Sequence, residues 1–164
     1  MAVFGDKRRS MRPGGDRKDD AFPEFVELVE TLREDSDEAT TVILVEGERD
    51  VRSLRRLGVR GTIMLVHHGN TISEVAEEVA RRGRRVIVMT DWDTEGGRLA
   101  QRLKEFLGGV RLELDLDSRR KFARVLRGEV VHVEGLAGWA RRNAERYGGT
   151  LDDLLPGREG AEPF

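Results

Sequence analysis

The chain has 164 residues, of which 38% are hydrophobic and 37% are charged, and its formal net charge is −2. This length suits one domain with added segments at its ends, and the composition favours a soluble protein whose surface is crowded with Arg, Glu and Asp. The absence of cysteine excludes disulfides and thiolate metal sites, and no stretch approaches the roughly 20 apolar residues that cross a bilayer, so we expect a cytoplasmic protein without membrane contact in which carboxylates bind any metal.

The two ends of the chain have the composition of tails. Residues 1–20 mix Lys, Arg, Asp, Gly and Pro with few apolar side chains, so they predict a flexible N-terminal tail. Residues 148–164 are again rich in Gly, Pro and acidic residues and predict a C-terminal tail, although the leucines within 151–155 could dock a last short turn. The domain itself is then predicted over 21–147.

Helices and strands alternate between these tails. Apolar residues at helical spacing predict a helix over 22–35. Four short apolar runs rich in branched residues predict strands, at 41–45, 62–66, 85–89 and 110–114. The amphipathic segments between them predict helices that end at Gly58, Gly83 and Gly108. This order predicts an α/β fold with a four-stranded, mostly parallel, doubly wound sheet flanked by helices, whose sites lie beyond the carboxyl ends of the strands.

The last third of the predicted domain is a helical extension. Helices are predicted over 117–127 and 134–147, while 130–133 (VVHV) fits either a short strand or a link. These helices carry several arginines and a lysine that supplement the acidic residues elsewhere: Arg119, Arg120, Lys121, Arg124, Arg127, Arg141, Arg142 and Arg146.

Carboxylates follow the first and third predicted strands, where this fold places a ligand. Glu46 follows the first, and Asp91 and Asp93 follow the third. Since Asp91 and Asp93 are two apart, an extended chain projects both side chains to one side, roughly 7 Å apart along the backbone. Carboxylates about 5 Å apart repel by about 3 kcal/mol at an effective dielectric near 20. A cation would relieve this repulsion, and oxygen ligands suit Mg²⁺.

Glycines and helix starts accompany these acids. Gly47 and Gly96 would let the backbone come close to a phosphate. The helices that begin near Glu48 and Thr94 would direct their positive ends into the same crevice. Anion and cation sites are therefore expected side by side.

At these residues the sequence resembles the Toprim family. VILVEGERD, at 42–50, resembles its hydrophobic strand followed by E-G-x-x-D, and VIVMTDWDTEG, at 86–96, resembles its strand followed by D-x-D. The string T-D-x-D-x-E-G, Thr90 to Gly96, is similar to the form in type IA topoisomerases and reverse gyrase. The resemblance covers about 41–115. In size and motifs the chain is most similar to small stand-alone Toprim proteins and to Toprim nucleases that mature ribosomal RNA.

The resemblance implies Mg²⁺, with Mn²⁺ able to replace it, bound by Asp91 and Asp93. It implies Glu46 as a further ligand or as the general acid/base in phosphodiester cleavage or transfer, with Asp50 and Glu95, like Gly47 and Gly96, in support. A type IA topoisomerase also needs a nucleophilic tyrosine from a separate domain, whereas the one tyrosine here, Tyr147, lies near the end. Primases need a zinc region, for which there is no cysteine.

Three further residues are candidates for nucleic-acid contact, each with a structural alternative. His68 could contact phosphate or form local hydrogen bonds in its loop. Trp92 could stack on a base or pack over the end of the sheet. Arg98 could steady a phosphate or form a surface ion pair on its helix.

The leading functional hypothesis is an Mg²⁺-dependent nuclease, with RNA processing as its narrower form. The alternative is a non-catalytic module that binds nucleic acid or assembles with a protein partner that performs the chemistry. A phosphatase of the haloacid-dehalogenase type is disfavoured, because Glu95 replaces the usual Thr or Val and the motif follows the third strand. The choice of RNA or DNA, the number of metal ions and the oligomeric state stay open.

Overall fold

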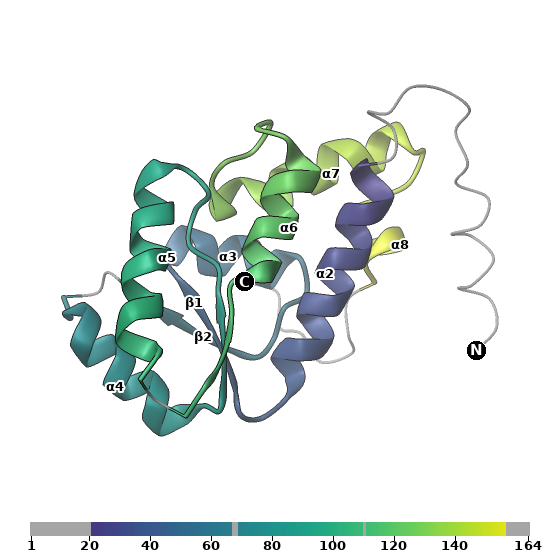
Figure 1. Ribbon diagram of the computed structural model, residues 1–164. Helices are drawn as coiled ribbons and strands as arrows, with labels where there is room; N and C mark the ends of the chain where they lie inside the picture. Colours follow the sequence, from purple (N-terminus) through teal and green to yellow (C-terminus); the bar gives the residue numbers. More distant parts are fainter. Residues whose placement is uncertain (1–20, 67–68, 110, 157–164) are drawn as a thin grey trace.

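The computed structural model describes residues 21–66, 69–109 and 111–156 (Figure 1). The predicted tail 1–20, the candidate His68 and residues 157–164 lie outside the described residues.

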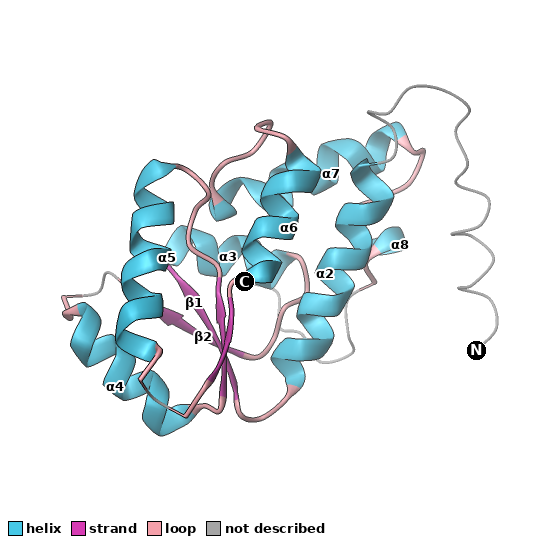
Figure 2. Cartoon of the chain, in the orientation of Figure 1, coloured by secondary structure: helices cyan, strands magenta, loops and turns pink. Residues whose placement is uncertain are grey.

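Helices and strands follow the predicted order (Figure 2). The strands are β1 (Thr41–Val45), β2 (Thr62–Leu65), β3 (Arg85–Val88) and β4 (Glu113–Asp115). Helix α2 (Ala21–Asp37) precedes the sheet, and α3 (Glu48–Arg56), α4 (Ile72–Arg82) and α5 (Thr94–Leu107) join successive strands. The extension consists of α6 (Asp117–Leu126), the 3₁₀ turn η1 (Val133–Gly135), α7 (Leu136–Arg146) and α8 (Leu151–Leu154).

The four described strands form one parallel sheet in the order β2-β1-β3-β4. Ile43 of β1 lies between Ile63 of β2 and Ile87 of β3. The chain runs from β1 outward to β2 and then returns to the other side of β1 for β3. The strand order therefore reverses between β1 and β3, and in open α/β sheets ligands bind at the carboxyl ends of the strands at such a point. The predicted four-stranded doubly wound α/β sheet is confirmed.

Both faces of the sheet are buried, which explains the continuously apolar strands. Val42 and Leu44 of β1 face a cluster built with α4 and α5. Ile43 and Val45 face the opposite cluster, to which α2, α3, α6 and α7 contribute. Successive side chains of a strand point to opposite faces, so β1 stabilises both layers and its carboxyl end is held firmly in place.

One segment differs from the sequence predictions, and a second resolves an alternative that they left open. The fourth strand begins at Glu113 and pairs only with β3 over three residues, because it is the edge strand and has one neighbour; position 110 of the predicted strand is outside the described residues. The segment 130–133 is a link and not a strand. It runs past the turn that follows β3, where Trp92 N donates to the carbonyl of Val131 at 3.0 Å.

The described part of the predicted C-terminal tail packs against the domain. Thr150 caps the short helix α8 by accepting a hydrogen bond from the backbone of Asp153. Leu155 is only 5% exposed and belongs to the same apolar cluster as α2. Arg33 of α2 donates to the carbonyl of Pro156 at 2.8 Å. The leucines within 151–155 thus belong to a last short turn that contacts the domain, as the sequence allowed.

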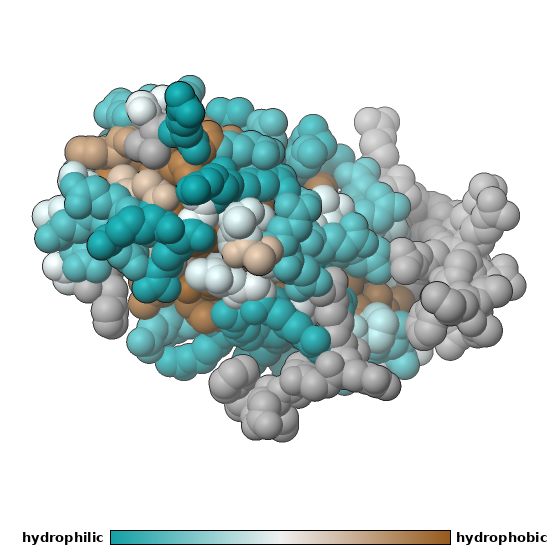
Figure 3. Space-filling model, turned by 90° about the horizontal axis from the view of Figure 1, so that it is seen from below, coloured by the Kyte–Doolittle hydropathy of each residue, from teal (hydrophilic) through white to brown (hydrophobic). Residues whose placement is uncertain are grey.

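Many charged side chains of the described residues are exposed, as the composition predicted. Figure 3 views the molecule from below Figure 1, and hydrophilic residues cover most of that face, with apolar residues visible in limited areas between them. Arg85 illustrates how such charges tie elements together, since its guanidinium lies 3.0 Å from Asp35 of α2 and 3.4 Å from Asp115 of β4. Among the described helices, none has the length and apolar character that spanning a membrane would take.

Candidate functional site

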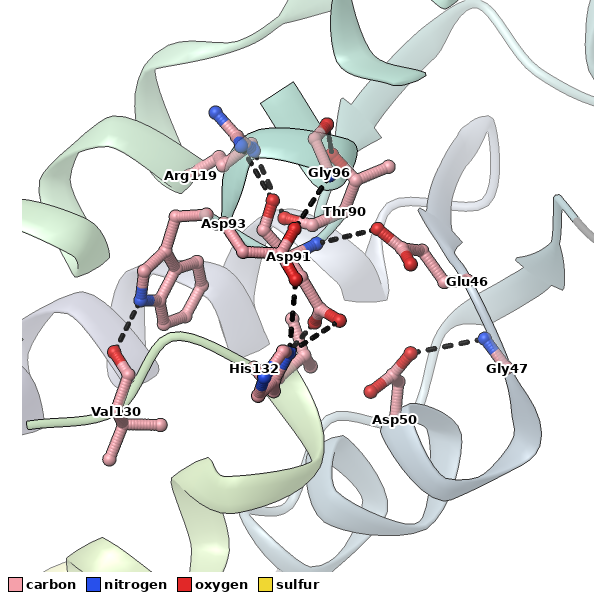
Figure 4. A network of polar contacts seen from close by, with 12 residues as sticks. Glu46, Gly47, Asp50, Thr90, Asp91, Asp93, Gly96, Arg119, Val130 and His132 are labelled. Carbon is pink, nitrogen blue, oxygen red and sulfur yellow. Dashed lines mark hydrogen bonds and ion pairs between the residues drawn. The ribbon is translucent and has the colours of Figure 1, made fainter. Parts of the chain in front are cut away.

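The carboxylate of Glu46 links the ends of β1 and β3. Glu46 directly follows β1, and its Oε1 accepts a hydrogen bond from the backbone N of Asp91 at 3.1 Å (Figure 4). Burial raises the pKa of Glu46, and the negative charges of Asp91 and Asp93 raise it further. The structure thus brings together the three acids predicted from two separate motifs.

Asp91 is the most enclosed of these acids, with a side chain that is 12% exposed. Its Oδ1 accepts a hydrogen bond from the backbone N of Val133 at 2.8 Å. Its Oδ2 lies 3.0 Å from Nδ1 of His132. Both oxygens are therefore oriented by the link between α6 and α7.

Asp93 caps helix α5. Its Oδ1 accepts a hydrogen bond from the backbone N of Gly96 at 2.7 Å, which leaves Oδ2 on the side of His132, 3.5 Å from Nδ1. Because Asp93 sits at the positive end of α5, the predicted convergence of a helix N-terminus and the acidic site is present.

Three side chains are placed to hold a metal ion. Asp91, Asp93 and His132 each offer one ligand atom, and these atoms lie within 4.8 Å of one another. Carboxylate oxygens and imidazole nitrogens are common ligands of divalent cations in proteins. Glu46 is adjacent through the amide of Asp91 but is not a member of this group of three.

His132 is not among the site residues predicted from the sequence. It lies in the link 130–133, and two hydrogen bonds from Trp92 hold this link against the D-x-D turn: the backbone N binds Val131 O and the indole N binds Val130 O. The hydrogen bond to Asp91 raises the pKa of His132, and the charges of the nearby carboxylates add to this effect. A lone histidine in an apolar stretch carried no spacing signal that could have identified it.

Asp50 supports the turn that carries Glu46. Its Oδ2 accepts a hydrogen bond from the backbone N of Gly47 at 3.0 Å and so closes the first turn of α3. The side chain is buried, and burial raises its pKa, with a further contribution from the charge of Asp91. A β-carbon at Gly47 would meet no atom of the described residues within 4 Å, so these residues leave open space beside the turn.

Arg119 of α6 brings positive charge to the acidic centre. Its Nε donates to the carbonyl of Thr90 at 3.0 Å, and its Nη2 donates to the carbonyl of Asp91. Burial lowers the pKa of Arg119, while the neighbouring charges of Glu46 and Asp93 act in the opposite direction. In the sequence Arg119 was only one of several basic residues, whereas in the fold it lies at the site.

The remaining candidates occupy different surroundings. Trp92 is half-buried and its ring stacks on Phe122, with centroids 6.4 Å apart, so its indole already has a packing partner; base stacking stays a prediction. Arg98 and Glu95 are exposed on the first turns of α5. Gly96 accepts a hydrogen bond from the Thr90 hydroxyl at 2.9 Å.

A cleft of about 520 Å³ opens beside the acids. Its lining includes Glu46, Gly47, Asp50, Asp91, His132 and Glu134. The cleft thus lies between the end of β1, the end of β3 and the link before α7. This is the switch point of the sheet, where the strand order reverses between β1 and β3.

Comparison with known proteins agrees with this architecture. The Toprim domain family matches residues 41–125. A UPF0292 protein of Methanosarcina barkeri is 37% identical over 110 residues, which are 67% of this chain and 76% of that protein. A UPF0292 protein of Thermococcus gammatolerans is 36% identical over 117 residues, which are 71% of this chain and 84% of that protein.

A solved structure shares the fold. It is described as a putative protein from Aquifex aeolicus, has a TM-score of 0.56 and 29% sequence identity, and covers 66% of this chain and 94% of its own. The Toprim match includes both acidic motifs and all four described strands, while His132 lies beyond it. From this match and from the meeting of Glu46 with Asp91 and Asp93 at one sheet edge, we conclude that the chain belongs to the Toprim domain family.

Proposed function

We propose that this protein is an Mg²⁺-dependent enzyme that cleaves phosphodiester bonds in nucleic acid, with processing of RNA as the narrower form of its activity. Membership of the Toprim family supports a metal-dependent function related to nucleic acids. The observation that carries the proposal is the 3.1 Å contact between Glu46 and the backbone of Asp91, which joins the two acidic motifs at the switch point.

Asp91 and Asp93 are the proposed ligands of Mg²⁺, with Mn²⁺ able to replace it. Each carboxylate is oriented by a backbone N–H, from Val133 and Gly96 respectively, and such outer contacts fix the direction in which a ligand oxygen points. A bound ion would polarise the phosphate and stabilise the attacking and leaving oxygens.

Glu46 is the proposed general acid/base. Its burial and its acidic neighbours raise its pKa, which brings a carboxyl group closer to the range in which it exchanges protons at neutral pH. Because Oε1 is held by the amide of Asp91, Oε2 is the atom we assign to proton exchange with the reacting oxygen. Arg119 places positive charge beside these acids and would favour an approaching phosphate.

The first turn of α5 is the proposed phosphate contact. Arg98 is exposed there, close in sequence to the capping residue Asp93, and a helix N-terminus favours anions. The space beside Gly47 gives the nucleic-acid backbone room at the cleft. The Trp92 ring stacks on Phe122 and its indole N–H donates to Val130 O, so we assign Trp92 to holding the link 130–133.

Asp93→Asn gives a sharp test, because asparagine retains an oxygen that can cap α5 through Gly96 N while the charge is lost. The purified protein is incubated with structured ribosomal RNA precursors and with DNA, with and without Mg²⁺. We expect cleavage by the wild type in Mg²⁺ and a loss of at least about 100-fold in Asp93→Asn. Glu77→Gln, an exposed change on α4, is the matched charge control and should cleave normally.

Equal cleavage by Asp93→Asn and the wild type would contradict the proposal. Nucleic-acid binding that depends on Mg²⁺, without cleavage by the wild type, would instead support the non-catalytic module that works with a partner.

A further inference from the structure

The position of His132 extends the metal site beyond the family's acidic motifs. His132 follows the residues matched to the Toprim domain, yet its Nδ1 lies 3.0 Å from Asp91 Oδ2 and 3.5 Å from Asp93 Oδ2. The imidazole therefore faces both carboxylates that are proposed to bind the ion.

These separations are compatible with atoms that share one ion, and the shorter one also suits the hydrogen bond between His132 and Asp91. Two ligand atoms each about 2.1 Å from a metal are about 3.0 Å apart at a right angle and about 3.4 Å apart at the tetrahedral angle. The two distances from His132 Nδ1, 3.0 Å and 3.5 Å, correspond to this range.

The main chain holds His132 in this place from both sides. Before it, Val130 O and Val131 O accept hydrogen bonds from the indole and the backbone of Trp92. After it, Val133 N donates to Asp91 Oδ1, which also turns Asp91 Oδ2 toward the imidazole. Residues on both sides of His132 are thus bonded to the same D-x-D turn that supplies the carboxylates.

The type of ligand atom determines which metal ions this arrangement binds more tightly. Mg²⁺ takes oxygen ligands and keeps several waters, whereas first-row transition metals such as Co²⁺, Ni²⁺ and Zn²⁺ bind imidazole nitrogen well. Replacing one oxygen ligand by Nδ1 therefore strengthens the binding of transition metals more than that of Mg²⁺.

We infer that His132 is a third protein ligand of the ion held by Asp91 and Asp93, and that it raises the affinity of the site for first-row transition metals more than its affinity for Mg²⁺. This inference rests on the proposed metal site and specifies its third ligand. The competing role for His132 is that of a protonated ion-pair partner of Asp91 that binds no metal.

Binding of Co²⁺ and Mg²⁺ chlorides, measured by isothermal titration calorimetry, separates these roles. We expect the wild type to bind Co²⁺ at least about tenfold more tightly than Mg²⁺. His132→Ala should lose about tenfold or more of its Co²⁺ affinity and less than about threefold of its Mg²⁺ affinity. His132→Asn keeps a polar side chain and should show the same selective loss, and Asp93→Asn should weaken both metals.

A spectroscopic measurement tests directly whether an imidazole nitrogen binds the ion. The chain has three histidines, so His67→Ala combined with His68→Ala leaves His132 as its one histidine. Electron spin echo modulation of Mn²⁺ bound to this protein should show coupling to an imidazole ¹⁴N, and the coupling should disappear when His132→Ala is added.

The outcomes distinguish the inference from the proposed function. If Mg²⁺ binds and depends on Asp93, but no ¹⁴N coupling appears and the ratio of Co²⁺ to Mg²⁺ affinity is the same in His132→Ala, His132 is only an ion-pair partner and this inference alone fails. If the wild type binds neither ion with saturation, the proposed metal-dependent function fails together with it.

Discussion

Gly96 and Asp91 touch through their backbones: a β-carbon at Gly96 would lie 1.8 Å from the carbonyl oxygen of Asp91. A carbon that is not bonded to an oxygen cannot approach it so closely, so a side chain at 96 must separate the start of α5 from the turn after β3. From its sequence position this glycine was predicted to make room for a phosphate, whereas the structure shows that it makes room for the backbone of Asp91. Gly96 keeps both aspartates of the D-x-D turn in place.

Gly96→Ala is therefore expected to destabilise the protein by more than about 2 kcal/mol, in the range of other overpacking changes. Gly97→Ala is the matched control, since its β-carbon would only contact Arg119 at 3.7 Å. In a helix this second change should stabilise by about 0.5–1 kcal/mol. Urea unfolding followed by circular dichroism measures both, and equal effects of the two substitutions would show that the close approach is absent.

Glu46→Gln is expected to stabilise the metal-free protein. The substitution removes a half-buried charge that Asp91 and Asp93 repel, while the amide oxygen can still accept the hydrogen bond from Asp91 N. We expect Tm to rise by roughly 2–4 °C, the change that about 1 kcal/mol produces in a domain of this size.

Glu48→Gln is the control for this charge effect. Glu48 is exposed, lies in the first turn of α3 and forms a 3.8 Å ion pair with Arg52. Removal of its charge should leave Tm unchanged or slightly lower, because a negative charge is favourable at a helix N-terminus. A lower Tm for Glu46→Gln, measured in the presence of a chelator, would mean that repulsion at the site is already relieved within the protein.

The sequence predicted the three acids because the information is local. Glu46, Asp91 and Asp93 each follow a buried strand within a few residues, and the carboxyl ends of parallel strands share one edge of the sheet. Once the strands were recognised, the meeting of these residues followed from the fold.

The other side of the site depends on tertiary packing. His132 is 41 positions from Asp91 and reaches it only because α6 and the following link fold back over the sheet end. Arg119 is brought to Asp91 in the same way. Helical and strand periodicity do not indicate that a later segment folds back over the sheet end. From the sequence, Arg119 was therefore only one member of a basic group, and His132 had no predicted role.

Trp92→Phe is expected to loosen the link that carries His132. Phenylalanine can keep the stack on Phe122 but cannot donate to Val130 O, and a lost hydrogen bond of this kind costs about 1 kcal/mol. We expect a lower affinity for divalent metals in addition to the lower stability, since the position of His132 becomes less fixed.

Trp139→Phe separates these two effects. Trp139 also loses an indole hydrogen bond, to Glu129, and is buried against Phe22 and Phe25. Trp139→Phe should lower the stability at least as much as Trp92→Phe does, but it should leave the affinity for divalent metals unchanged. Titration calorimetry on both variants checks this, and a parallel loss of affinity in both would show that the metal site responds to global stability alone.

The docking of the C-terminal segment can be tested at Leu155. This side chain is 5% exposed in the cluster that contains α2, so Leu155→Ala should destabilise the protein by about 2–4 kcal/mol, as other buried leucines do. Leu154 is half-buried, and Leu154→Ala should cost less than half as much. Thermal melts of the full chain measure the difference. If Leu155→Ala melts like the wild type, the segment after 147 does not stabilise the domain, and the boundary predicted from composition at position 148 is the better description of the folded unit.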